Sequence, residues 1–253
     1  MNEAMTPEQW EELSDRLWEE FSRFDTKVMF IERVEYIKTQ LETLREHYNE
    51  EELDSLLEAL AAIEAALANR ESEAEEWEEL SDRLWEEFDY LRSKMYLEQS
   101  IRQTEMHLDT LRGYYDESEL QSLLTMLSEA RAALTDPESG TEKWQELADQ
   151  LWKELDYLNA KMVLEKNIEY VKGQLEALRE HYNDDELQPL VEILTKAETT
   201  LANGEATNSE LYTLSDQLLE AFNHLHEKLG QVVLPAAPQV TVDDEQNVII
   251  GGR

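Results

Sequence analysis

The sequence predicts an all-α protein built from tandem three-helix bundles, and three observations support this prediction. A twelve-residue string recurs at an interval of 67 residues. Within each interval, apolar residues are spaced three and four apart, which is the period of an amphipathic helix. Ala, Leu, Glu, Gln and Lys predominate before residue 230, and these residues lose little rotamer freedom in a helix.

The repeat is visible in two independent markers. The string WEELSDRLWEEF occupies residues 10–21 and returns unchanged at 77–88, with the related strings WQELADQLWKEL at 144–155 and LYTLSDQLLEAF at 211–222. A second marker keeps the same interval, as LREHYNEEEL at 44–53, LRGYYDESEL at 111–120 and LREHYNDDEL at 178–187. Two markers with one period indicate an internal repeat of one structural unit.

Each period predicts three helices with apolar faces. In the first unit these faces comprise Val34, Ile37, Leu41, Leu44 and Tyr48, then Leu53, Leu56, Leu57, Leu60, Ile63 and Leu67, and then Trp77, Leu80, Leu84, Phe88 and Leu91. Asn49 separates the first two helices and is expected to be the N-cap of the second, which begins with acidic residues. Stop signals end the second helix of each unit at Asn69, Asp136–Pro137 and Asn203–Gly204.

The connections between units are predicted to be helical. Between Trp77 and Leu111 the chain contains neither proline nor glycine, so the third helix of one unit is expected to continue into the first helix of the next. Such a helix of almost 40 residues would span roughly 55–60 Å. Short loops make the other neighbouring helices antiparallel. The prediction is a rod of bundles fused by shared helices, similar to the way spectrin repeats are joined.

These patterns predict five segments. Residues 1–26 form an orphan helix, equivalent to the third helix of a preceding unit; bundles occupy 27–93, 94–160 and 161–230; and 231–253 form a linker and the start of a truncated β-module. The orphan helix lacks the two partners of its apolar face, so the chain is expected to be a piece of a longer array. In the tail, Pro235 and Pro238 end any helix, and Gln239–Thr241 and Asn247–Ile250 predict short strands.

Composition excludes several classes of function. The net charge of −37, from 59 acidic and 22 basic side chains, repels nucleic-acid phosphates and anionic lipids. The absence of cysteine excludes disulfides, Cys-ligated zinc and thiol nucleophiles. No apolar run of about 20 residues is present to span a bilayer. We expect a monomer that binds no nucleic acid and inserts into no membrane. Because the N-terminus lacks signal-peptide features, the chain is either intracellular or an internal piece of a longer protein.

No motif indicates catalysis. The Gly-rich phosphate loop, HExxH and GxSxG patterns are missing, and a narrow bundle offers no cleft to separate the pKa values of two carboxylates. His47 and His181 are expected to interact with helix C-termini, whereas His224 and His226 point to different faces. We therefore predict a protein that is not an enzyme and has no cofactor or metal. The acidic clusters at 183–186 and 243–245 leave weak calcium binding open, although neither matches an EF-hand.

Three tryptophans are the candidate ligand contacts. Trp18, Trp85 and Trp152 flank the core stripe, where an indole stays partly exposed. The more common role of such residues is to seal the junction between helices. The alternative is that they stack on sugar rings. Burial of all three would favour a structural role, and one open face lined by them would favour a binding role.

The repeat unit resembles the FIVAR domain (Found In Various Architectures). In residues 182–226 the resemblance falls on Tyr182, Leu187, Leu194, Ala197, Leu201, Asn203, Ala206, Thr207, Leu214, Leu218 and Leu225. The second unit matches through Tyr115, Leu127, Ala130, Leu134 and Thr141, and the first through Tyr48, Leu60, Leu67 and Asn69. The resemblance implies an extracellular place in modular surface or secreted proteins of Gram-positive bacteria, a linking or adhesive role, and no catalytic residue.

The expected function is therefore a non-catalytic stalk or spacer that projects neighbouring modules of the same polypeptide. The first alternative is an adhesin-like module that recognises a host protein or glycan through repeated surface residues. The second is an intracellular helical scaffold, favoured if the complete reading frame encodes neither a signal peptide nor a wall anchor.

Overall fold

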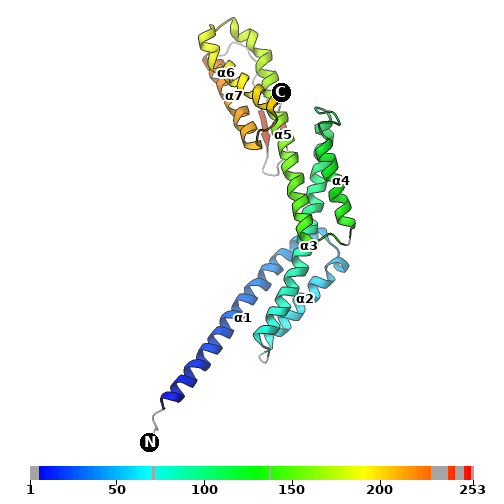
Figure 1. Ribbon diagram of the computed structural model, residues 1–253, viewed down its shortest axis with the longest axis vertical. Helices are drawn as coiled ribbons and strands as arrows, with labels where there is room; N and C mark the ends of the chain where they lie inside the picture. Colours follow the sequence, from blue (N-terminus) through cyan, green and yellow to red (C-terminus); the bar gives the residue numbers. More distant parts are fainter. Residues whose placement is uncertain (1–5, 70–71, 137, 229–238, 243–247, 252–253) are drawn as a thin grey trace. The chain divides into compact units, whose positions relative to one another are not determined.

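The computed structural model describes residues 6–69, 72–136, 138–228, 239–242 and 248–251. Over these residues the chain is helical except for one pair of short strands, so the predicted helical class is confirmed (Figure 1). The elements are α1 (Pro7–His47), α2 (Glu50–Ala68), α3 (Ala74–Arg112), α4 (Gln121–Thr135), α5 (Thr141–Arg179), α6 (Asp184–Asn203), α7 (Asn208–Lys228), β1 (Gln239–Val242) and β2 (Val248–Gly251). The chain divides into two compact units, Met1–Gln99 with Ala130–Ala148, and Ser100–Glu129 with Asp149–Arg253.

Three helices are about twice as long as α2, which has 19 residues. α1 has 41 residues, and α3 and α5 have 39 each. The expected continuity at Lys94 and Lys161 is confirmed, because each lies inside an unbroken helix. α1 likewise runs without a break across the boundary predicted between residues 1–26 and 27–93, as expected for a helix shared between units. The absence of proline and glycine from α3 explains how that helix persists.

In the first unit, three helices contribute to one hydrophobic core. The cap between α1 and α2 is the predicted one: the Asn49 side chain accepts the N–H groups of Glu51 and Glu52, and the Glu52 carboxylate accepts the Asn49 N–H. The core comprises buried side chains from α1, α2 and the first half of α3, namely Phe30, Val34, Ile37, Leu41, Leu44, Tyr48, Leu53, Leu56, Ala59, Leu60, Ile63, Ala66, Leu67, Trp77, Leu84, Phe88 and Leu91.

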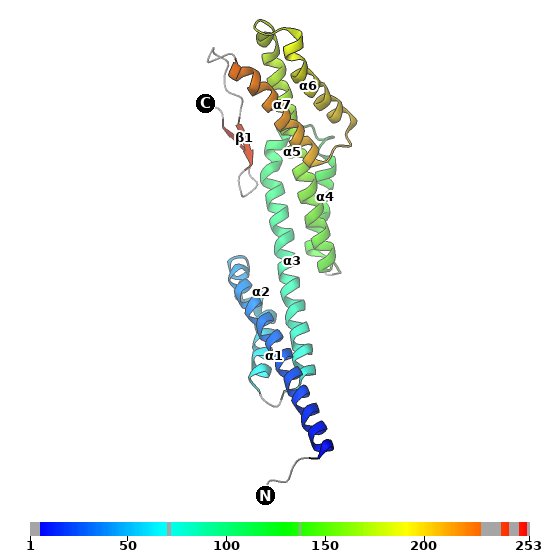
Figure 2. The ribbon, with the colours of Figure 1, turned by 90° about the vertical axis from the view of Figure 1, so that its left-hand side faces the viewer.

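In the second unit, α6 and α7 lie side by side against the C-terminal half of α5 (Figures 1 and 2). Asn183 and Glu186 form the cap at the start of α6, and Gly204 ends that helix with φ 67°, a left-handed conformation that glycine adopts without strain. The core comprises Ala160, Leu164, Ile168, Val171, Leu178, Leu187, Leu190, Leu194, Ala197, Leu211, Leu214, Leu218, Phe222 and Leu225. Pro189 lies inside α6 on its exposed side, where the missing N–H removes one helical hydrogen bond.

The second period departs from the first at the start of its middle helix. α4 begins at Gln121, four residues later than the 67-residue interval from Glu50 places it. The Asp116 carboxylate accepts the N–H groups of Ser118 at 2.8 Å and Glu119 at 3.0 Å, which holds residues 116–119 in a tight turn.

The two strands form an antiparallel pair in which Gln239 lies opposite Gly251 and Val242 lies opposite Val248. The prolines expected to end the last helix, Pro235 and Pro238, lie outside the described residues.

Candidate functional site: exposed aromatic residues and a repeated tyrosine network

The structure places the three candidate tryptophans in different environments. Trp18 of α1 is 68% exposed and Trp85 of α3 is 41% exposed, whereas Trp152 of α5 is half-buried. The three indoles are therefore neither all buried nor all open.

The sealing role falls to the tryptophans eight positions earlier in the second and third copies of the string. Trp77 and Trp144 are buried, and each indole N–H donates to a backbone carbonyl oxygen eleven positions back, on Ala66 and Ala133 respectively. The side chains of Arg23 and Lys27 also lie 5.6 and 5.5 Å from the Trp77 ring centroid. These contacts fix the first turns of α3 and α5 onto the last turns of α2 and α4.

Trp85 forms an exposed aromatic pair with Tyr36 of α1, here named the Tyr36–Trp85 platform. The ring centroids are 6.1 Å apart with an interplanar angle of 30°, and both rings also contact the buried Phe88. Because Phe88 anchors the pair to the core, the two rings are held in place while their outer surfaces stay open. In the next period the position of Tyr36 is occupied by Gln103, so Trp152 has no equivalent second ring there.

A second constellation is built around the tyrosine that ends the first helix of each period. The Tyr48 hydroxyl lies 3.2 Å from the carbonyl oxygen of Leu91 and 3.4 Å from the Glu98 carboxylate, so its single proton is shared between two acceptors. The Lys94 ammonium lies 5.1 Å from the Tyr48 ring centroid and pairs with Glu52 at 3.5 Å and Glu98 at 3.9 Å. We call these five residues the tyrosine network.

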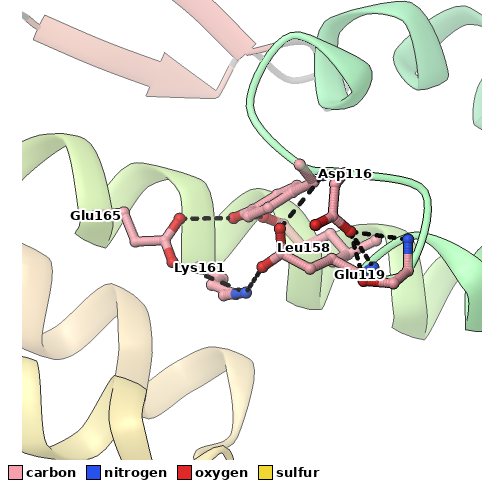
Figure 3. A network of polar contacts seen from close by, with 7 residues as sticks. Asp116, Glu119, Leu158, Lys161 and Glu165 are labelled. Carbon is pink, nitrogen blue, oxygen red and sulfur yellow. Dashed lines mark hydrogen bonds and ion pairs between the residues drawn. The ribbon is translucent and has the colours of Figure 1, made fainter.

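The same network recurs 67 residues later. The Tyr115 hydroxyl lies 3.3 Å from the carbonyl oxygen of Leu158 and 3.1 Å from the Glu165 carboxylate. Figure 3 shows Lys161 between Glu119 and Glu165, to which its ammonium pairs at 3.0 and 3.8 Å. The same ammonium lies 4.6 Å from the Tyr115 ring centroid.

In the third period, the hydroxyl–carbonyl contact recurs among the described residues. The Tyr182 hydroxyl donates to the carbonyl oxygen of Leu225 at 2.5 Å, again 43 positions ahead. Val232 stands in the sequence where Glu98 and Glu165 stand in the earlier copies. The hydroxyl–carbonyl bond is therefore the constant part of the network, and the carboxylate is an addition in the first two copies.

The electrostatics of the network make the phenols permanent hydrogen-bond donors. Burial, followed by the nearby Glu98 charge, raises the pKa of Tyr48 far above its usual range, and burial with Glu165 does the same for the pKa of Tyr115. Burial opposes the charge of Lys161, but its hydrogen bond to Glu119 and the neighbouring carboxylate charges together outweigh burial and raise the pKa of the ammonium. The network thus consists of neutral phenols and a compensated ion pair, which is an arrangement suited to holding helices together.

Other candidate sites are weaker. A hollow of about 430 Å³ between α6 and α7 is lined by Lys196, Thr200, Glu205, Thr207, Glu210 and Gln217 among others. Across the described residues no group of three or more His, Asp or Glu side chains is placed to hold a metal ion. Of the two acidic clusters, 183–186 forms the N-cap and first turn of α6, with Asn183 and Glu186 making the cap hydrogen bonds, and 243–245 lies outside the described residues.

Two further expectations can be located in the structure. His47 ends α1, with its Nδ1 atom 3.1 Å from the Thr43 carbonyl oxygen, which agrees with a role at a helix C-terminus. Within the part of the chain that the structure describes, no helix has the length and apolar character needed to cross a membrane.

No known protein family, no curated protein and no solved structure matches this chain.

Sequence reasoning did not find the tyrosine network or the Tyr36–Trp85 platform. A signal for the network was present, because Tyr48, Glu52, Lys94 and Glu98 all reappear 67 positions later as the same residue types. The signal for the platform was incomplete, since Gln103 replaces Tyr36 in the second period and Leu219 replaces Trp85 in the third.

Proposed function

We propose that this chain is a non-catalytic helical-repeat spacer of a modular bacterial surface or secreted protein. The observation that carries the proposal is the recurrence of the same contacts at the same spacing: the tyrosine hydroxyl reaches a carbonyl 43 positions ahead in three periods, and the tryptophan indole reaches one 11 positions back in two. Repetition of a structural contact without a repeated cleft is typical of a scaffold.

The finer architecture in this proposal is a tandem array of three-helix bundles. Two continuous cores, one shared by α1, α2 and α3 and the other by α5, α6 and α7, support it. The unbroken α3 and α5 would each belong to two successive bundles and resist bending between them. In the first two periods the tyrosine network would lock the first helix to the third, at the point where the third helix passes into the next bundle.

The proposed location outside the cell rests on the resemblance to FIVAR repeats. The net charge of −37 fits a spacer, because it opposes self-association and keeps the chain soluble. We propose that the chain acts as a monomer, connects neighbouring modules of one polypeptide, and needs no cofactor.

Small-angle X-ray scattering on wild type and on a variant lacking residues 94–160 tests the spacer proposal. A compact chain of 253 residues has a radius of gyration of about 18 Å, and the spacer requires a value well above this. Deleting one period must shorten the maximum dimension while leaving the helical circular dichroism per residue unchanged. A radius close to the compact value in the wild type would contradict the proposal.

One observation favours the alternative of a glycan-binding module, namely the Tyr36–Trp85 platform. Two anchored rings with open outer faces can stack on the apolar face of a sugar. Titration with soluble cell-wall and host polysaccharides, followed by tryptophan fluorescence, tests this. Trp85→Ala must abolish binding, whereas Trp18→Ala, which removes an exposed indole outside the platform, must leave it intact. Equal loss in both variants, or no binding, would remove the alternative.

The remaining alternative is an intracellular scaffold. It is favoured if the complete reading frame encodes neither a signal peptide nor a wall anchor, which sequencing of the full gene decides.

A further inference from the structure

The first and second copies of the repeated string have identical sequences and opposite environments. Trp10 is 59% exposed, while Trp77, at the same place in the string, is 1% exposed. Leu17 is 63% exposed, while its counterpart Leu84 is 1% exposed. The string is WEELSDRLWEEF in both places, so local sequence cannot account for the difference.

The two copies differ in whether other helices pack against them. The second copy lies in the core shared with the C-terminal half of α1 and with α2. The first copy lies in the N-terminal part of α1, which no other described helix covers in Figures 1 and 2. Its open apolar side chains are Trp10, Leu13, Leu17, Trp18, Phe21 and Phe24. We call this surface the N-terminal face.

We propose that the N-terminal face is a docking site for a helical hairpin of the same repeat class as residues 28–69. The occupant would consist of two antiparallel amphipathic helices with the character of residues 28–69, because that hairpin covers the identical string at 77–88. The inference rests on the three-helix arrangement of the proposed function.

The contacts of the second copy specify the chemistry of the occupant. Its second helix must end with a carbonyl oxygen that can accept the Trp10 indole N–H, as Ala66 does for Trp77 at 3.2 Å. Its first helix must carry a basic side chain for the Ser14 hydroxyl, since Arg33 donates to Ser81 at 3.3 Å.

Charge and area are compatible with this occupant. Residues 7–24 contain six acidic and two basic side chains, a net charge of −4, so pairing between two copies of the N-terminal face is opposed by repulsion. A hairpin like residues 28–69 is also acidic. Residues 28–69 nevertheless pack against the equally acidic string at 77–88 in the first unit. Covering the open side chains would bury roughly 500 Å² on this side, which is enough for a small specific interface when matched by the partner.

The test uses the full chain and a synthetic peptide of residues 28–69, which contains no tryptophan. We expect 1:1 binding by isothermal titration calorimetry, with a blue shift of the tryptophan emission. In Leu17→Ser/Phe21→Ser the affinity must fall by at least about tenfold, because both side chains are at the centre of the face. These positions are exposed, so the variant keeps its fold, which circular dichroism verifies. Glu12→Gln/Glu19→Gln, on the opposite side of α1, is the matched control and must bind normally.

The isolated peptide can fail to bind simply because it does not fold on its own. A second variant of the chain therefore carries the hairpin within the same molecule. Residues 28–76 are placed directly before Trp10 in the full chain, so that the hairpin meets the N-terminal face within one molecule at high effective concentration. The Trp10 fluorescence, isolated by difference against Trp10→Phe, must then shift to the blue. No shift in this fusion overturns the proposal.

Two other outcomes would also overturn it. One is peptide binding that survives Leu17→Ser/Phe21→Ser, because the peptide would then bind elsewhere. The other is a dimer of the chain alone, detected by analytical ultracentrifugation and abolished by the same variant, since the occupant would then be a second copy. The two proposals fail separately. If only docking fails, the radius of gyration of the wild-type chain still lies well above the compact value. If the spacer proposal fails, that radius is close to the compact value.

Discussion

The indole N–H of Trp77, in the first turn of α3, donates a hydrogen bond to the backbone carbonyl oxygen of Ala66 in the last turn of α2, at 3.2 Å. The pair Trp144 and Ala133 repeats this bond at 2.9 Å between α4 and α5. In both pairs the indole donates to a carbonyl in the last turn of a helix, where acceptors lack the i+4 N–H of a continuing helix. The bond therefore ties the end of one helix to the start of the next.

Replacement of this indole is predicted to destabilise the chain. Trp77→Phe removes the hydrogen bond and leaves a small cavity, and should lower the free energy of unfolding by about 2–3 kcal/mol. Trp10→Phe is the control, because the same sequence surrounds an exposed indole, and its effect should stay within about 0.5 kcal/mol. Urea unfolding followed by circular dichroism measures both. An equal loss of unfolding free energy in the two variants would contradict the burial of Trp77 and its hydrogen bond to Ala66.

The tyrosine network leads to a second prediction. Tyr48→Phe and Tyr115→Phe should each lower the free energy of unfolding by about 1 kcal/mol, because the hydrogen bonds of a buried hydroxyl between two helices are lost. Tyr114→Phe, at an exposed ring beside Tyr115, should have little effect. Chemical denaturation of the three variants checks this, and an unchanged stability in Tyr48→Phe and Tyr115→Phe would argue against the hydroxyl–carbonyl bonds.

The raised pKa values of Tyr48 and Tyr115 predict an alkaline limit of stability. The ordinary pKa of the tyrosine hydroxyl is 10.0, and burial raises it in both residues. The folded state therefore holds these protons more tightly than the unfolded state, so the contribution is complete below pH 10 and is lost as the pH rises above it. The free energy of unfolding should fall above pH 10, and fall less steeply in the Tyr48→Phe/Tyr115→Phe double variant. If the free energy of unfolding fell equally steeply with pH in wild type and in the double variant, the raised pKa values of Tyr48 and Tyr115 would be contradicted.

Salt should stabilise this chain. With 59 acidic and 22 basic side chains, repulsion among carboxylates outweighs the attraction in the surface ion pairs, so screening by salt weakens the repulsion more than the attraction. Raising NaCl from about 20 to about 300 mM should increase the urea midpoint. Calcium at equal ionic strength should add nothing further, because no group of three or more His, Asp or Glu side chains in the described part of the chain is placed to hold a metal ion. A larger stabilisation by calcium than by NaCl would reveal a specific calcium site.

Helix boundaries followed from local chemistry and could be predicted from the sequence. Asn49 begins α2 and Asn203–Gly204 ends α6, as capping preferences indicate. The start of α4 could not be predicted by periodicity, because Asp116 holds a turn in place of the first helical turn.

Burial and cross-helix contacts were less predictable. Trp10 and Trp77 share their neighbours in sequence, yet one is exposed and the other buried, because burial depends on helices that lie far away in the chain. Tyr36 and Trp85 come from different helices, and only the packing of α1 against α3 brings their rings together.

The continuity of α3 is the basis of the proposed spacer, and a single distance tests it. The chain has no cysteine, so Glu76→Cys/Asp109→Cys allows two spin labels at exposed positions of this helix. Double electron–electron resonance should give a narrow distribution centred near about 50 Å, from 33 residues at 1.5 Å each. A broad distribution, or one centred below about 35 Å, would show that the helix is broken and would contradict the proposed spacer.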